Sequence, residues 1–308
     1  MKISKFRDLI PSTESRRGFL GSLAGGSAAV VGWLSAGALF RSSASAAPAT
    51  AFAPLPEVPE SDIIRQQRDL QAALTKPLSA RRWAMVIDPR MCTGCSACVI
   101  SCRAENVTGP DGSYRRVAEG PAGHYPAVTN VFMPSNCVQC DDPPCQRAVP
   151  PGMITKRPDG IVEFDYAKLT GGHAKKAAAA CPYRAVHIDE GKFFTTGTPA
   201  EQAYEKRDFV EYHREWNRAD GSLPDGVARK CHFCLDRVEA GILPACVSNC
   251  PSTAMAFGDL GDAGSFASRL LRENRTIRLH EELGIEPRVH YIEEKLIDVP
   301  QYACATCH

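Results

Sequence analysis

The sequence predicts a loop-rich α+β fold that is arranged around groups of cysteines. Its 308 residues include 24 Gly and 23 Pro, which interrupt regular structure and so predict many loops. Short apolar runs at 83–88, 160–164 and 185–188 indicate strands, whereas 98–106 and 265–273 favour helices. The chain also contains 14 Cys, and their spacing is not that of a disulfide framework.

The first 46 residues are typical of an export signal that is removed from the mature protein. Arg16 and Arg17 form a twin-arginine pattern, and the weakly apolar run 18–40 follows them. The small residues Ala44 and Ala46 then predict cleavage before Ala47. An uncleaved membrane anchor is the alternative, because the run carries no charge and is long enough to span a bilayer. Its frequent Gly and Ser favour a signal peptide, so we expect a mature protein exported to the periplasm.

The mature chain is divided by composition into an extension, a body and a tail. Residues 47–82 form an N-terminal extension, a Pro-rich lead followed by a polar helix over 61–75. The body covers 83–293 and includes an aromatic and charged insertion at 191–227, and the tail is 294–308. The formal net charge of +1 argues against nucleic acid as a partner, since binding to it needs a concentrated basic face.

The spacing of the first cysteine group is typical of a protein that holds a [4Fe–4S] cluster. The group is Cys92-x2-Cys95-x2-Cys98-x3-Cys102. Three thiolates on a tight loop can reach three irons of one cubane, and the fourth ligates the other cluster of a pair. Zinc sites instead use pairs of x2 spacings that lie far apart in the chain.

A second group near the end of the body repeats this pattern with a long insertion. It is Cys231-x2-Cys234-x11-Cys246-x3-Cys250, and taken alone it is also compatible with a zinc ribbon. Beside the first group, we interpret it as the partner half of a two-cluster module. We assign the first set of ligands as Cys92, Cys95, Cys98 and Cys250. We assign the second set as Cys102, Cys231, Cys234 and Cys246.

Two further groups are incomplete in complementary ways. One has Cys137, Cys140 and Cys145 but carries Val149 where its fourth cysteine is due. The other keeps only Cys181, and the same spacings counted back from it give Ala177, Ala174 and Gly171. In a pair of clusters, the first three cysteines of each group are completed by the fourth cysteine of the other group. The third set is therefore Cys137, Cys140, Cys145 and Cys181, and a fourth set has lost all its thiols. We expect three [4Fe–4S] clusters, with a helix over 173–180 packed where the fourth would sit.

The last five residues form a C-x-x-C-H motif. This motif is typical of c-type haem attachment, in which Cys304 and Cys307 form thioethers and His308 is the proximal iron ligand. Haem is attached outside the cytoplasmic membrane, where the export signal sends the chain. A small disulfide ring or a pair of free thiols is the alternative.

Several of these motifs resemble those of the four-cluster ferredoxin subunits of dimethyl-sulfoxide reductase, polysulfide reductase and formate-dependent nitrite reductase (NrfC-type) systems. The resemblance spans about residues 83–293. It rests on the run 85–95, Cys137-Val-Gln-Cys140-Asp-Asp-Pro-Pro-Cys145, Asp159-Gly-Ile-Val-Glu-Phe-Asp, Cys181-Pro-Tyr, Leu243-Pro-Ala-Cys246 and Phe257-Gly-Asp-Leu260. With its own export signal, the chain is most similar to the iron–sulfur subunit of the DsrMKJOP complex. The emptied cluster set, the insertion and the haem motif depart from the family pattern.

The resemblance implies two ferredoxin-like (bacterial dicluster) modules, each a small antiparallel sheet with two short helices around a cluster pair. A flexible C-terminal tail would carry the haem. The insertion 191–227 is equally compatible with a docking surface and with a cover over the clusters.

The function that the resemblance implies is electron transfer without substrate chemistry. The expected partners are an NrfD-like polytopic membrane subunit that reacts with quinone and a periplasmic multihaem cytochrome c. The first alternative is the iron–sulfur subunit of a periplasmic molybdenum-containing reductase. The second alternative is a structural zinc-binding or assembly protein.

Overall fold

The computed structural model of this protein describes residues 60–293, apart from residues 111, 123, 127 and 201. Contacts divide the chain into Met1–Glu57 and Val58–His308, and the described residues all belong to the second unit. The predicted export signal and the C-x-x-C-H motif lie outside the described residues.

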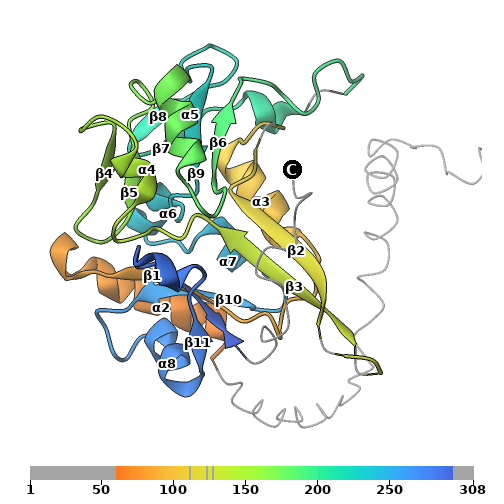
Figure 1. The fold of residues 1–308 in the computed structure, drawn as a ribbon, viewed down its shortest axis with the longest axis vertical. Coiled ribbons are helices and arrows are strands. Elements are labelled where there is room, and N and C mark those ends of the chain that lie inside the picture. Colours follow the sequence, from red (N-terminus) through yellow and green to blue (C-terminus); the bar gives the residue numbers. More distant parts are fainter. Residues whose placement is uncertain (1–59, 111, 123, 127, 201, 294–308) are drawn as a thin grey trace, which may run out of the picture. The chain divides into compact units, whose positions relative to one another are not determined.

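The described chain contains short helices and strands joined by many loops (Figure 1). The helices are α2 (Asp62–Leu74), α3 (Ala97–Asn106), α4 (Pro144–Arg147), α5 (Gly171–Ala179), α6 (Leu235–Glu239), α7 (Ala245–Ser248) and α8 (Phe266–Glu273), with the 3₁₀ turns η1 (Leu78–Ala80), η2 (Ala203–Lys206) and η3 (Glu281–Leu283). The strands are β1 (Trp83–Ile87), β2 (Arg115–Ala122), β3 (Thr129–Asn136), β4 (Ile154–Lys156), β5 (Val162–Phe164), β6 (Val186–Asp189), β7 (Phe209–Glu211), β8 (Arg214–Trp216), β9 (Val227–Lys230), β10 (Met255–Asp259), β11 (Thr276–Ile277) and β12 (Val289–Ile292).

Strand β1 lies inside a four-stranded sheet of order β10-β1-β12-β11. All five of its residues are buried, as expected of a strand that has neighbours on both sides. It pairs antiparallel with β10 and parallel with β12. The expectation of purely antiparallel sheets is therefore wrong here. The parallel pair arises because the last described strand returns to lie beside the first, as Figure 1 shows.

Helices α2 and α8 pack against this sheet, and each begins at a serine cap. The Ser61 side chain accepts a hydrogen bond from the Ile64 N–H, and Ser265 does the same for Ser268. Such caps satisfy backbone donors that the first turn leaves free. Helix α2 buries Leu70 and contacts β10 and α8.

The remaining strands form four two-stranded ribbons. The longest pairs β2 with β3 over eight residues each, and it extends away from the other strands (Figure 1). Strands β6 and β9 pair antiparallel, with Asp189 opposite Val227. This register places the two ends of the 191–227 insertion side by side, so the insertion leaves and re-enters the fold at one point.

The insertion is packed against the body rather than left as a free arm. The β7–β8 hairpin buries Phe209 and Trp216, which join the same apolar cluster as Leu169 and Val227. Glu211 and Arg218 from the insertion are buried as well. The hairpin is therefore part of the folded body, while Phe194 is exposed.

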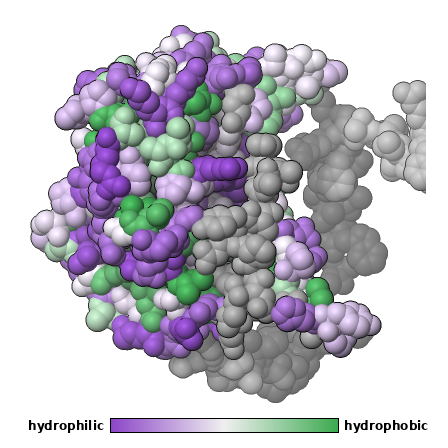
Figure 2. Space-filling model, viewed as in Figure 1, coloured by the Kyte–Doolittle hydropathy of each residue, from purple (hydrophilic) through white to green (hydrophobic). Residues whose placement is uncertain are grey.

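The described part of the chain contains no helix that is long and apolar enough to cross a membrane. On the face drawn in Figure 2, hydrophobic residues form small patches among hydrophilic ones.

Candidate iron–sulfur sites

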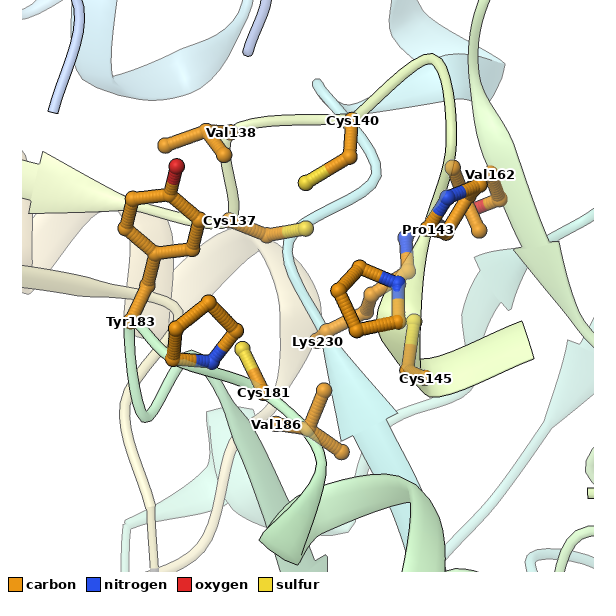
Figure 3. A pocket seen from close by; sticks show the side chains of 12 residues that line it. Cys137, Val138, Cys140, Pro143, Cys145, Val162, Cys181, Tyr183, Val186 and Lys230 are labelled. Carbon is orange, nitrogen blue, oxygen red and sulfur yellow. Dashed lines mark hydrogen bonds between the residues drawn. The ribbon is translucent and has the colours of Figure 1, made fainter. Parts of the chain in front are cut away.

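The structure brings together the four thiols of the third set. Cys137 and Cys140 lie in the loop between β3 and α4, Cys145 lies in α4, and Cys181 follows α5. All four line one cavity, together with apolar groups such as Val162 and Val186. Figure 3 shows their sulfur atoms on different sides of this space.

The four thiols of the first set line a second cavity. Cys92 and Cys95 come from the loop after β1, Cys98 from α3, and Cys250 from the segment after α7. Cys95 is exposed, whereas Cys98 is buried. This site therefore reaches the protein surface at Cys95.

The thiols of the second set lie deeper in the protein. Cys102, Cys231, Cys234 and Cys246 are all buried. Burial raises the pKa of Cys102 well above its usual value, and the neighbouring Cys234, Cys246 and Cys231 raise it further. Burial, followed by Cys246, likewise raises the pKa of Cys231 to about 12. The four thiols therefore lie close enough to influence one another's ionisation.

The second set is adjacent to each of the other two. Among the neighbours that raise the pKa of Cys98, a first-set thiol, is Cys246 of the second set. Among those that raise the pKa of Cys231, a second-set thiol, is Cys137 of the third set. The second set therefore lies between the other two.

A left-handed residue recurs at one place in the C-x-x-C turns that begin at Cys92, Cys137 and Cys231. It stands two positions after the first cysteine, as Gly94 (φ +70°), Gln139 (φ +52°) and Phe233 (φ +57°). Alternation of right- and left-handed residues turns successive backbone N–H groups toward one side, which favours an anion there. In one of these turns the Phe233 N–H donates to Cys231 Sγ at 3.4 Å.

The two Cys–Pro segments also share a local structure. Cys181 Sγ accepts the N–H of Ala185 at 3.4 Å, and Cys250 Sγ accepts that of Ala254 at 3.3 Å. The third residue after each cysteine, Arg184 or Thr253, is left-handed. The repeated geometry agrees with the expectation of two related modules.

The emptied fourth set is filled by apolar packing. Val149, Ala174 and Ala177 belong to one buried cluster, and the two alanines are 0% exposed. The alanines form the inner face of α5. Gly171, at the start of α5, has a positive φ and open space beside it.

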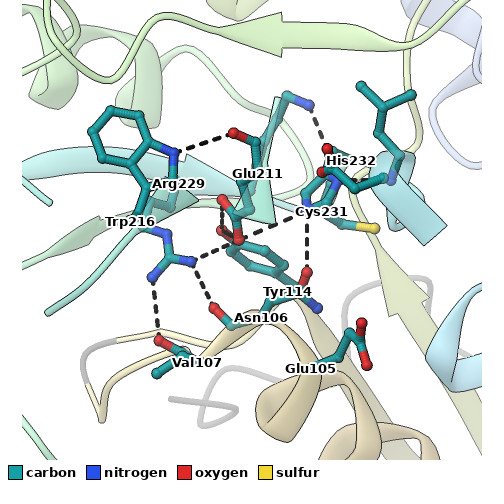
Figure 4. A network of polar contacts seen from close by, with 12 residues as sticks. Glu105, Asn106, Val107, Tyr114, Glu211, Trp216, Arg229, Cys231 and His232 are labelled. Atoms are coloured by element: carbon teal, nitrogen blue, oxygen red, sulfur yellow. Dashed lines mark hydrogen bonds and ion pairs between the residues drawn. The ribbon is translucent and has the colours of Figure 1, made fainter. Parts of the chain in front are cut away.

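A buried ionic network lies beside the second set and includes residues that the sequence did not single out. Asp189 accepts hydrogen bonds from Arg218 and from Arg229. Arg229 also donates to Glu211 at 2.6 Å, as Figure 4 shows. Tyr114 donates to Glu211 at 2.9 Å. No periodicity or spacing marks these partners, because they come from distant segments.

One arm of the network reaches a thiol of the second set. His232 Nδ1 accepts the N–H of Leu235 at 2.8 Å, so Nε2 carries the proton of the neutral ring and faces Asn106 Oδ1 at 3.0 Å. The Asn106 amide in turn donates to Cys102 Sγ at 3.5 Å.

The residues present fit iron–sulfur clusters. Each set consists of thiols alone, the ligand type that such clusters use. Burial raises the pKa of Cys98 to about 11 and that of Cys145 to about 12, so these thiols lose their protons only to a metal at neutral pH. Arg115 lies beside Cys246 and has two buried N–H groups, Nε and Nη1, without an acceptor. Cluster sulfides are acceptors that such donors suit.

The thiol sets differ from sites for a single ion. Among residues 60–293, as far as they are described, no three His, Cys, Asp or Glu side chains are close enough together to hold one metal ion. The thiols of the first and third sets surround cavities instead, which suits a cofactor of several atoms.

Thiol sets around cavities in a mixed helix and sheet fold define an iron–sulfur protein, and comparison with known proteins agrees. A family model described as a 4Fe-4S dicluster domain matches residues 128–196 and 217–260. The chain is 44% identical to a selenate reductase subunit of Mesobacillus selenatarsenatis, over 78% of this chain and 82% of that protein. It is 33% identical to a polysulfide reductase component of Wolinella succinogenes, over 70% and 96%, and 32% identical to protein NrfC of Escherichia coli K12, over 74% and 88%.

The chain therefore belongs to the 4Fe–4S dicluster family of iron–sulfur subunits of reductase complexes. The family resemblance expected from the motifs is confirmed. Its members are electron-transfer subunits of oxidoreductase complexes and not the catalytic subunits.

Proposed function

We propose that this chain passes single electrons through three [4Fe–4S] clusters, held by the first, second and third thiol sets. The observation that carries the proposal is that the four thiols of each set converge, although they come from segments far apart in the chain. A thiolate-held cubane takes up or gives up one electron with little change in geometry, because the charge spreads over its irons.

The chain's own residues would tune and insulate these sites. Backbone N–H groups of Phe233, Ala185 and Ala254 donate to ligand sulfurs, which stabilises negative charge there. Apolar residues around the cavities exclude water, and the second set is the most deeply buried. Electrons would enter or leave at the two end sites, of which the first reaches the surface at Cys95.

The terminal motif supports the proposal of one covalent c-type haem on Cys304, Cys307 and His308. The twin-arginine pattern at Arg16 and Arg17 supports export to the periplasm, where haem attachment takes place. Protein purified from the periplasm should therefore keep a haem stain through denaturing electrophoresis. The double variant Cys304→Ala with Cys307→Ala should lose the stain and keep the cluster absorbance.

The proposed partners are an NrfD-like, quinone-reactive membrane subunit and a periplasmic multihaem cytochrome c, in a sulfur-metabolism complex of the DsrMKJOP type. The export signal of this chain supports that choice. A position at the periplasmic face of the membrane follows from these partners.

A second candidate is the iron–sulfur subunit of a molybdenum-containing reductase in the periplasm. The 44% identity to the selenate reductase subunit supports it. The two candidates differ in what co-purifies with the chain from native membranes. Molybdenum in the purified complex would favour the reductase, and a multihaem cytochrome without molybdenum would favour the DsrMKJOP type.

The number of clusters tests the proposed function directly. Anaerobically purified protein should contain about twelve cluster irons, four for each cubane. Its oxidised form should show no three-iron signal by electron paramagnetic resonance. Cys181→Ala should create such a signal or lose about four irons, whereas Ala180→Ser should change neither. A stoichiometric three-iron signal in the unaltered protein would show that Cys181 does not complete the third set.

A further inference from the structure

Two buried cations stand between neighbouring thiol sets and have the sets as their negative neighbours. They are Arg115, the first residue of β2, and Lys230, the last residue of β9. Their relative exposures are 1% and 0%. A buried cation costs several kcal/mol unless negative charge or hydrogen bonds compensate it, so its neighbours reveal its role.

Arg115 contacts the second set and acts on the first. Its Nη2 donates to Cys246 Sγ at 3.2 Å and also lies 3.0 Å from Met85 Sδ. Its charge opposes the effect of burial on the pKa of Cys98 in the first set and of Cys231 in the second. A guanidinium keeps its proton in proteins, so Arg115 is a cation here.

Lys230 occupies the corresponding place between the second and third sets. Its side chain lines the cavity of the third set, where Figure 3 shows it among the four cysteines. Its Nζ donates to the carbonyl of Cys231, in the second set, at 3.1 Å and to that of Val162 at 2.6 Å. The ring of Phe164 lies 4.9 Å from Nζ, an arrangement that favours an ammonium ion.

The cations of the ionic network beside the second set have different partners. Arg218 and Arg229 are both paired with carboxylates, those of Asp189 and Glu211. Within the described part of the chain, neither Arg115 nor Lys230 forms an ion pair with Asp or Glu, and two N–H groups of Arg115 have no acceptor. Carboxylates thus compensate the cations of the network, whereas Arg115 contacts a thiol and Lys230 lines the cavity of the third set.

We propose that Arg115 and Lys230 raise the reduction potentials of the clusters on either side of them, Arg115 at the step from the first to the second and Lys230 at the step from the second to the third. The inference rests on the proposed three-cluster function. Reduction adds one negative charge to a cluster, and a nearby cation in a medium of low dielectric stabilises that charge. Because each cation lies between two clusters, it raises the reduction potentials of both. The difference between the two potentials therefore stays small.

The test is a redox titration of the full mature protein, followed by electron paramagnetic resonance. The variants are Arg115→Met and Lys230→Met, which remove charge, and Arg115→Lys and Lys230→Arg, which keep it. Lys175→Met, at an exposed lysine of α5, is the control. Signals are assigned to sites with Cys95→Ser for the first cluster and Cys140→Ser for the third.

Each charge-removing variant should shift the reduction potentials of two clusters and leave that of the third unchanged. Arg115→Met should lower the potentials of the first and second clusters, and Lys230→Met those of the second and third. Each reduction equilibrium should shift at least tenfold, which is about 59 mV for a one-electron couple. The remaining cluster of each variant should match the unaltered protein, and so should the charge-keeping and control variants. Equal shifts in all three clusters, or no shifts, would overturn the proposal.

Loss of iron is also informative. If the Met variants lose clusters while Arg115→Lys and Lys230→Arg keep them at unaltered potentials, the charge is required and the proposal holds. If the charge-keeping variants lose iron to the same extent, the two residues act through shape and the proposal is wrong. Absence of clusters from the unaltered protein would refute the proposed function itself.

Discussion

At the scale of single residues, the turns that carry the thiols depend on backbone conformations that few residues adopt. Gly94 meets this requirement with the residue best suited to it, because glycine has no Cβ to clash at positive φ. Gln139 and Phe233 adopt the same conformation with large side chains, which then serve the fold. The Gln139 amide donates to the Cys231 carbonyl at 2.6 Å and so connects two thiol sets.

Gly94→Ala should destabilise the protein and reduce occupancy of the first cluster. At φ +70° an added Cβ strains the backbone, and it would also lie 2.5 Å from the ring of Phe132. Gly152→Ala is a matched control, because Gly152 has φ +83° and nothing within 4 Å. The free energy of unfolding of the control should fall only by the cost of backbone strain, about 1–2 kcal/mol. That of Gly94→Ala should fall by more. Denaturant midpoints and iron content measure the difference, and equal losses would contradict the role given to Phe132.

At the scale of elements, the ranges predicted from sequence agree with the structure wherever the local signal is strong. Helix α8 lies within the predicted range 265–273, because Ser265 caps it. Strand β1 coincides with an uninterrupted apolar run. The β2–β3 ribbon was not predicted, since Pro121 and Pro134 argue against strands. Each of its strands has only one neighbour in the sheet, so proline is tolerated there.

The insertion contributes to the stability of the fold, because the carboxylate of its Glu211 compensates the charge of the buried Arg229. Burial alone would raise the pKa of Glu211, but Arg229 and His232 outweigh it and lower the pKa to about 2. Glu211→Gln should therefore cost about 3–5 kcal/mol, the range for breaking a buried pair. Glu215→Gln, at an exposed position of the same hairpin, should cost about 0.5 kcal/mol or less.

The pH dependence of this loss follows from the same pKa. A carboxylate with a lowered pKa stabilises the fold above its unfolded pKa, and that contribution disappears as the pH falls toward 2. Between about pH 5.5 and 8 Glu211 is ionised in both states, so the difference between the two proteins should stay constant. Denaturant unfolding followed by tryptophan fluorescence, which includes the buried Trp216, measures it. A difference that disappears within this range would contradict the ion pair.

At the scale of the whole molecule, sequence spacing predicts an assignment of the thiols to sets but not the order of the sets. The crossed assignment follows from the complementary gaps at Val149 and Cys181, because a lost cluster removes four ligands at once. The linear order and the cations Arg115 and Lys230 depend on tertiary contacts between β2, β9 and the cysteine loops. Such contacts join segments that are far apart in the chain, and no local pattern records them.

The linear order can be tested by removing one cluster at a time. In the fully reduced protein, neighbouring paramagnetic clusters should broaden one another's resonance, the first with the second and the second with the third. The double variant Cys231→Ala with Cys234→Ala removes the middle site, so about four irons should be lost and the two remaining signals should sharpen into independent spectra. The matched variant Cys92→Ala with Cys95→Ala removes an end site with the same loss of iron, and broadening between the second and third clusters should persist. Cys98 lies near Cys246 and Cys231 near Cys137, so the middle site is adjacent to both others. Broadening that survives removal of the middle site would show that the first and third clusters are themselves neighbours, and the proposed route for the electrons would then be wrong.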